Sequence, residues 1–232
     1  MASPTRYPAG VSTQSVGAPL GQYPLPDPTA EYTHFDDFNA YRAAEWTVTN
    51  TTSHATIASV AGPGGLLSIA GGGASVTNDI GAIISAPLDF NFSTTQPVWF
   101  YTSIKATTAA NDQLQVGLTS SNAALTPTDG IYFNKAAGTA AIDFVVRKSS
   151  TSTTQAAVAT LANNTFLQLA FYYNGKDAID VFVAGVKVYT QLVLTNLPSA
   201  VALATAFGVK AAATAPTTSN LVIDYALAAQ GR

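Results

Sequence analysis

The sequence predicts an all-β protein, an antiparallel two-sheet β-sandwich preceded by an extended N-terminal arm. Three observations lead to this prediction. Apolar runs of about five to eight residues recur along the chain, with Gly, Asn, Asp, Pro or Ser between them. Charged residues make up only 10% of the chain, and Thr, which favours strands, is abundant. Six of the 12 prolines lie within the first 28 residues.

Residues 1–33 are expected to form the arm, and residues 34–232 the sandwich domain. Each proline removes an amide donor and biases its predecessor toward extended geometry, so residues 22–29 cannot be helical, and the interspersed glycines favour an extended arm. The arm has few charges but several apolar side chains, which favours an arm that binds along a partner over a solvated tail. The arm residues expected to contact this partner are Tyr7, Val11, Val16, Leu20, Tyr23 and Leu25.

The first part of the body alternates between strands and stretches of small residues. Residues 34–46 are expected to form a short helical turn before a strand at residues 46–50. Turns in the Gly-rich stretch 61–73 flank a strand at residues 66–70. The next strands are expected at residues 82–85, 98–105 and 114–118.

The later half is more regular, and its hairpins have a local physical reason. Asn174-Gly175 and Ala184-Gly185 interrupt apolar runs, and Asn and Gly accept positive φ at low cost. Strands are expected at residues 130–133, 142–147, 166–173, 179–183, 187–193, 204–210 and 221–226. Ten or more strands at this spacing favour two packed antiparallel sheets.

The order of the later strands resembles the concanavalin A-like sandwich, the jelly-roll fold of lectin and laminin-G type modules. A strand that ends in Asn174-Gly175, followed by the strand at residues 179–183, looks like the central hairpin of that superfamily. The remaining likeness lies in residues 130–133, 142–148 and 221–225. The resemblance implies the fold but leaves function open, because this fold hosts lectins, hydrolases and structural modules.

A second resemblance concerns Phe35-Asp-Asp-Phe38 with Trp46, the absence of cysteine, the low charge and the uncharged arm. Together they resemble the sandwich modules of tailed-bacteriophage virion proteins. This resemblance implies a capsid decoration (cement) protein whose arm attaches to the major capsid protein or other virion subunits, and which forms a homo-oligomer. The expected location is the virion, after synthesis in the host cytoplasm, because MASPTRYPAG lacks the apolar core of a signal peptide.

The alternative hypothesis is a carbohydrate-binding, lectin-like host-recognition module on a tail or cell surface, with a glycan as its ligand. Trp46, Tyr172 and Tyr173 are the candidate ligand or interface aromatics. Neighbours on a strand face opposite sides, so one of Tyr172 and Tyr173 is expected to point outward. Trp99 and Tyr101 are further aromatic candidates, although packing in the core is the more common role of strand aromatics.

No catalytic residues, metal site or cofactor are expected. The only glutamates are Glu31 and Glu45, and no strand carries the alternating carboxylates with which glycosidases of this fold cleave sugars. His34 and His54 have no local partners for a hydrolase triad. The chain has no cysteine and no calcium-binding spacing.

Two classes of partner are not expected. The basic residues are scattered and the formal net charge is −3, whereas a nucleic-acid interface needs a concentrated basic face. No segment approaches the roughly 18 consecutive apolar residues that span a membrane.

Overall fold

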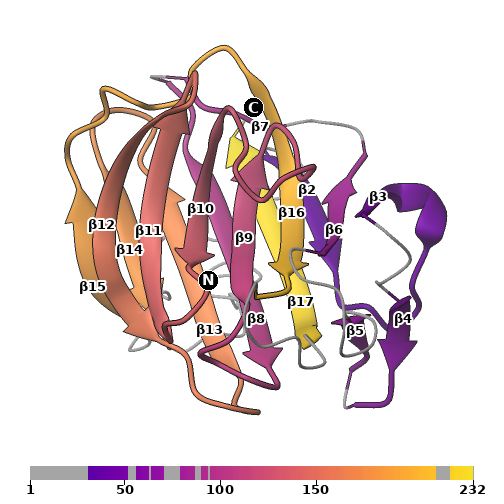
Figure 1. The fold of residues 1–232 in the computed structure, drawn as a ribbon. Helices are drawn as coiled ribbons and strands as arrows, with labels where there is room; N and C mark the ends of the chain where they lie inside the picture. Colours follow the sequence, from indigo (N-terminus) through magenta and orange to yellow (C-terminus); the bar gives the residue numbers. More distant parts are fainter. Residues whose placement is uncertain are drawn as a thin grey trace, which may run out of the picture.

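The protein is an antiparallel β-sandwich, as the sequence predicts (Figure 1). The computed structural model describes residues 31–51, 56–62, 64–70, 79–86, 90–93, 95–212 and 220–231. The arm residues from Tyr7 to Leu25 lie outside the described residues. The expected boundary between arm and body falls inside strand β2 (Glu31–Asp36), so the sheet begins before residue 34. No described helix is long and apolar enough to cross a membrane.

The front sheet, which is nearer the viewer in Figure 1, follows the order β12-β11-β10-β9-β16-β6-β3, and β7 pairs with β16. Its late strands form a meander in which each strand pairs with the next. Its strands are β3 (Trp46–Asn50), β6 (Ile80–Ser85), β7 (Phe90–Asn91), β9 (Gln113–Thr119), β10 (Gly130–Lys135), β11 (Ala141–Lys148), β12 (Thr151–Thr160) and β16 (Ala202–Lys210).

The back sheet follows the order β15-β14-β13-β8-β17-β5-β4, and β2 pairs with β17. The first and last described strands are therefore neighbours, with Phe35 opposite Leu227. Besides β2, its strands are β4 (Thr56–Val60), β5 (Leu66–Ala70), β8 (Val98–Ala106), β13 (Leu167–Tyr173), β14 (Ile179–Val183), β15 (Val186–Gln191) and β17 (Asn220–Gly231).

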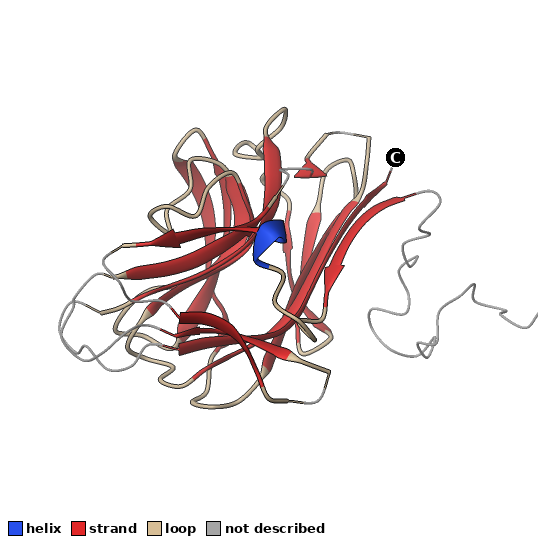
Figure 2. Ribbon diagram, turned by 90° about the vertical axis from the view of Figure 1, so that its right-hand side faces the viewer, coloured by secondary structure: helices blue, strands red, loops and turns tan. Residues whose placement is uncertain are grey.

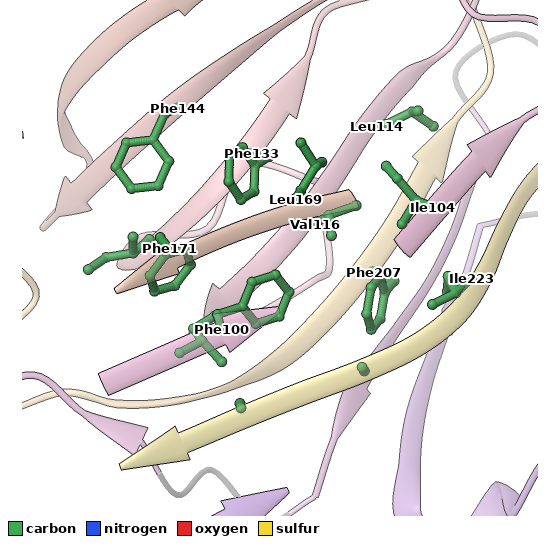
Figure 3. Close-up of a cluster of buried hydrophobic side chains, with 14 of the residues drawn as sticks. Phe100, Ile104, Leu114, Val116, Phe133, Phe144, Leu169, Phe171, Phe207 and Ile223 are labelled. Carbon is green, nitrogen blue, oxygen red and sulfur yellow. The ribbon is translucent and has the colours of Figure 1, made fainter. Parts of the chain in front are cut away.

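Aromatic and branched side chains from the inner faces of both sheets fill the space between them (Figure 3). Phe100 of the back sheet stacks on Phe171, and Phe133 and Phe144 of the front sheet lie against that same ring. Because these four rings belong to both sheets, their contacts fix how the sheets lie over one another. The outward faces are then free to carry polar and half-buried side chains.

The structure corrects the expectation for residues 34–46. They begin in strand β2, and the only described helical turn there is the 3-10 helix η2 (Ala43–Glu45), drawn in blue near the centre of the view in Figure 2. The Asp36 carboxylate explains the break between these elements, because it accepts hydrogen bonds from Phe38 N at 2.8 Å and from Trp46 Nε1 at 3.4 Å. The helical turn is therefore confined to the last residues before β3.

Candidate functional site

A pocket of about 400 Å³ opens on the outer face of the back sheet. Strands β2, β8 and β17 supply its floor, the end of β2 and the β4–β5 loop supply its walls, and two carboxylates are exposed to it. It is called the bulge pocket here. Its described lining residues are Phe35, Asp37, Gly64, Tyr101, Asp224, Tyr225 and Leu227.

Strand register places three apolar side chains abreast on the floor. Leu227 of β17 lies opposite Phe35 of β2 on one side and opposite Tyr101 of β8 on the other. Side chains opposite each other on one face lie about 5 Å apart, so the three form a continuous surface. Phe35 is 60% exposed although it is a large apolar residue. This exposure leaves one face of an aromatic ring available to a ligand.

A β-bulge puts two consecutive residues of β17 into the same pocket. The pairing of β17 with β8 shifts between Ile223 and Tyr225, and Asp224 is the extra residue. Ile223 and Ala226 on either side are fully buried in the core, whereas Asp224 and Tyr225 are half-buried and both line the pocket. A bulge re-aims side chains in this way because the inserted residue breaks the alternation of the strand.

The two tyrosine rings of the pocket hold each other in place. Tyr101 and Tyr225 meet edge to face, with ring centroids 5.2 Å apart and an interplanar angle of 64°. Burial, a hydrogen bond with Tyr101 and the nearby charge of Asp224 raise the pKa of Tyr225 above its ordinary value. A hydrogen bond with Gln168 on β13 acts in the opposite direction. Tyr225 is thus neutral, and its edge-to-face contact with Tyr101 orders its ring before any ligand arrives.

Of Trp46, Tyr172 and Tyr173, it is Tyr172 that faces outward, half-buried and with its ring centroid 5.2 Å from that of Trp99. Tyr173 is fully buried and packs on Phe92. Strand alternation predicted that one of the two tyrosines would be outside. Trp46 is 4% exposed, and its indole contacts Phe207. The expectation that Trp46 or Tyr173 contacts a ligand is therefore corrected, because core packing uses both rings.

Sequence reasoning found Tyr101 as a candidate but missed its partners in the pocket. The sequence pattern predicts a helical turn at Phe35 and one regular strand through Asp224 and Tyr225. The available signal was the pair Asp224-Tyr225, where polarity interrupts the apolar run Leu221-Val-Ile at its end. Polarity alone does not distinguish a bulge from an ordinary outward position.

The outer face of the front sheet carries a different arrangement. Gln115 on β9, Asn134 on β10 and Asp143 on β11 lie opposite one another in one row. Gln115 is 1% exposed, and its side-chain oxygen and nitrogen have no hydrogen-bond partner among the described residues. Leu125, from the loop between β9 and β10, reaches over this sheet and packs where Gly208 leaves room. Leu125 therefore covers the sheet beside Gln115, whereas the bulge pocket on the back sheet is open.

The structure also shows which carboxylates lie close enough together to serve catalysis or metal binding. Asp37 and Asp224 are the two carboxylates that the bulge pocket brings together, whereas Glu45 lies in η2 and forms an ion pair with Arg42 at 3.6 Å. Within the described part of the chain, no group of three or more His, Asp or Glu side chains could hold a metal ion.

Comparison with known proteins identifies the family and the fold. The family model described as "SO2946-like, C-terminal domain" matches residues 84–224. The solved structure of protein SO2946 from Shewanella oneidensis MR-1, described as of unknown function, has a TM-score of 0.60 and 17% identity, and the match covers 100% of this chain and 95% of that one. No curated protein matches the sequence.

Two further solved structures represent the enzymes and lectins of this fold. The endo-1,3-β-glucanase of Streptomyces sioyaensis has a TM-score of 0.63 and 13% identity over 90% of this chain and 99% of that one. Arcelin-5, a lectin-like defence protein of Phaseolus vulgaris, has a TM-score of 0.60 and 12% identity over 88% and 100%. These identities show the fold alone, which is the concanavalin A-like jelly roll. Since glucanases share it, the fold gives no support to the expectation of a non-enzymatic protein.

Proposed function

The chain belongs to the SO2946-like C-terminal domain family, and we propose that this member binds carbohydrate in the bulge pocket. One observation carries the proposal: the pocket joins ordered aromatic rings to two carboxylates on a surface open to solvent. Its volume of about 400 Å³ is within the range of small-molecule sites.

The chemistry of a sugar matches these groups. A pyranose ring has an apolar face of C–H groups, which packs on an aromatic ring such as Phe35 or Tyr101. Its hydroxyl groups point outward from the ring edge and donate hydrogen bonds, which the carboxylates of Asp37 and Asp224 can accept; such charge-assisted bonds are stronger than neutral ones. Because Tyr101 and Tyr225 are already ordered, binding loses little side-chain entropy.

The comparisons support the proposal at the level of the fold. A glucanase and a lectin-like protein share the sandwich, so this architecture is compatible with sites for sugars. Fold alone does not determine a ligand, and the proposal therefore depends on the residues of the pocket.

A glycan array followed by calorimetric titration of the strongest oligosaccharide tests the proposal. Phe35→Ala should weaken binding by about tenfold or more, because one stacking ring is lost. Phe166→Ala is the matched control, since Phe166 is also an exposed aromatic (40%) but lies outside the pocket, under the Lys105 ammonium at 4.7 Å. Equal binding by both variants and the unchanged protein would place any glycan site elsewhere.

A reducing-end assay with the same oligosaccharide separates binding from hydrolysis. Glycosidases also use two carboxylates as their catalytic residues; one acts as acid and the other as base or nucleophile. New reducing ends that appear on incubation with a bound oligosaccharide, and that disappear in Asp224→Asn, would make the site hydrolytic. Stable ligand over the same period supports a binding protein.

Attachment to neighbouring protein subunits is a second candidate function, and the edge of the back sheet favours it. Val186, Val188, Leu192 and Val193, in and just after the edge strand β15, are between 46% and 69% exposed. An edge strand with apolar side chains and unpaired backbone groups is a site where another chain can add. The virion role expected from the arm belongs to this candidate, and none of the similar proteins named above is described as a virion protein.

Leu192→Asp and deletion of residues 2–30 test this second candidate separately. Light scattering of the purified protein should report smaller assemblies for Leu192→Asp if the β15 edge is an interface. Deletion of residues 2–30 should leave the sandwich folded and abolish attachment if the arm is the attachment element. An unchanged mass and unchanged co-sedimentation with virus particles in both variants would reject assembly.

A further inference from the structure

We infer that the bulge pocket selects an amino sugar whose amine carries a positive charge. The inference rests on the proposed function and concerns the class of sugar. Asp37 and Asp224 bring two negative charges to the pocket, and no Lys, Arg or His is among its described lining residues. A pocket with this balance attracts a cation and repels uronic, sialic or sulfated sugars.

The position of Asp224 is fixed by the backbone rather than by an ion pair. The bulge turns Asp224 to the outer face, and the Asp224 carboxylate forms no hydrogen bond or ion pair with another described residue. The negative charge of Asp224 also acts on the nearby Tyr225 hydroxyl, and it is one of the causes that raise the pKa of Tyr225. The Asp224 charge is therefore directed toward the pocket and is not already neutralised there.

Asp37 faces the pocket from the end of β2. Its Oδ1 accepts a weak hydrogen bond from Asn39 N at 3.3 Å. That bond orients the carboxylate without cancelling its charge. Glu45, by contrast, forms an ion pair with Arg42 at 3.6 Å.

The aromatic groups add to the same preference. A cation over an aromatic face is attracted by the ring quadrupole, and Phe35, Tyr101 and Tyr225 all border the pocket. A protonated 2-amino sugar thus meets attraction from rings and carboxylates together. An N-acetylated sugar has the same pyranose ring and keeps the stacking, but its neutral amide loses both electrostatic contributions.

Calorimetric titration with a β-1,4-linked glucosamine tetramer and with its fully N-acetylated counterpart tests the inference, at a pH where the amines are protonated. We expect the unacetylated tetramer to bind about tenfold more tightly at low ionic strength, with the advantage falling as salt is added. Asp37→Asn and Asp224→Asn should each remove most of this advantage. Glu45→Gln, which removes one negative charge outside the pocket, should keep it.

The outcomes separate the inference from the proposed function. Equal affinity for the two tetramers, or no effect of Asp224→Asn, overturns the inference and leaves a neutral-sugar site. Absence of binding by any glycan overturns both. If an Asp variant fails to fold, the salt dependence of the unchanged protein decides, because a preference that is insensitive to salt is not electrostatic.

Discussion

Gly65 lies so close to Asn39 that a Cβ on Gly65 would be 2.5 Å from the Asn39 Cα and backbone N. This contact joins the loop between β4 and β5 to the turn that follows β2, and it brings Gly64 to the wall of the bulge pocket. Only glycine permits it, because the φ of Gly65 is +105° as well.

Gly65→Ala should therefore destabilise the protein and reduce glycan affinity, because the loop must move away from Asn39. We expect a loss of about 2 kcal/mol or more in the free energy of unfolding, measured by urea denaturation. Gly138→Ala is the control: its φ is +84°, but a Cβ there has no atom within 4 Å. If both variants lose the same stability, backbone strain rather than the Asn39 contact explains the effect.

Asp36→Ala should cost more stability than Asp37→Ala. The Asp36 carboxylate is 8% exposed and accepts from both Phe38 N and Trp46 Nε1, so its removal leaves two buried donors unpaired. A loss of roughly 2–4 kcal/mol is expected, accompanied by a change in tryptophan fluorescence. Asp37 accepts one exposed bond, and its replacement should change stability little. Similar unfolding curves for the two variants would contradict the bridging role of Asp36.

The stability of the protein should depend on pH through Lys135. Burial lowers the pKa of Lys135 from 10.5 to about 8, and the charge of Asp112 opposes this shift only partly. Between these pKa values the unfolded chain holds a proton that the folded chain has released, so stability rises with pH.

The comparison of the unchanged protein with Lys135→Met isolates this effect. The difference between their free energies of unfolding should increase in favour of the lysine by on the order of 2 kcal/mol from about pH 7 to about pH 9.5. Lys135 also donates to the carbonyls of Ala136 and Thr139, but the loss of those bonds shifts the curve equally at every pH. Parallel pH profiles would show that the lysine titrates normally.

Two buried glutamines should respond oppositely to replacement by methionine. Gln115 has no partner for either amide atom among the described residues, so Gln115→Met removes an uncompensated polar group and should stabilise the protein by about 1 kcal/mol. Gln191 donates to Val193 O at 2.9 Å and accepts from Tyr189, so Gln191→Met should destabilise it by about 1–2 kcal/mol. Thermal unfolding of both variants gives the comparison; a destabilised Gln115→Met would indicate that its amide is bonded through water.

Much of the fold could be predicted because the strands of the core carry local signals. The expected strands at residues 46–50, 66–70 and 179–183 match β3, β5 and β14. Most of their apolar side chains are buried between the two sheets, and Gly or Asn marks the turns beside them. Burial and turn chemistry both act over a few residues, so they are visible in the sequence.

The strands that the sequence pattern does not predict have weak local signals. Strand β12 (Thr151–Thr160) is an edge strand whose side chains are mostly exposed, and it contains Ser, Thr and Ala instead of an alternating apolar pattern. It is a strand because β11 pairs with it. Strand β2 is similar, since its extended form depends on pairing with β17, a partner about 190 residues away in sequence.

The candidate site likewise has some features that the local sequence predicts and others that depend on the pairing of distant strands. The sequence by itself determined that the chain is a sandwich, and that one of Tyr172 and Tyr173 faces outward, because both conclusions depend on the period of a strand. Only the tertiary structure decided that Phe35 and Tyr225 share a pocket, because a bulge and the pairing of distant strands bring them together. Pairing register is a property of two segments at once, and neither segment encodes it alone.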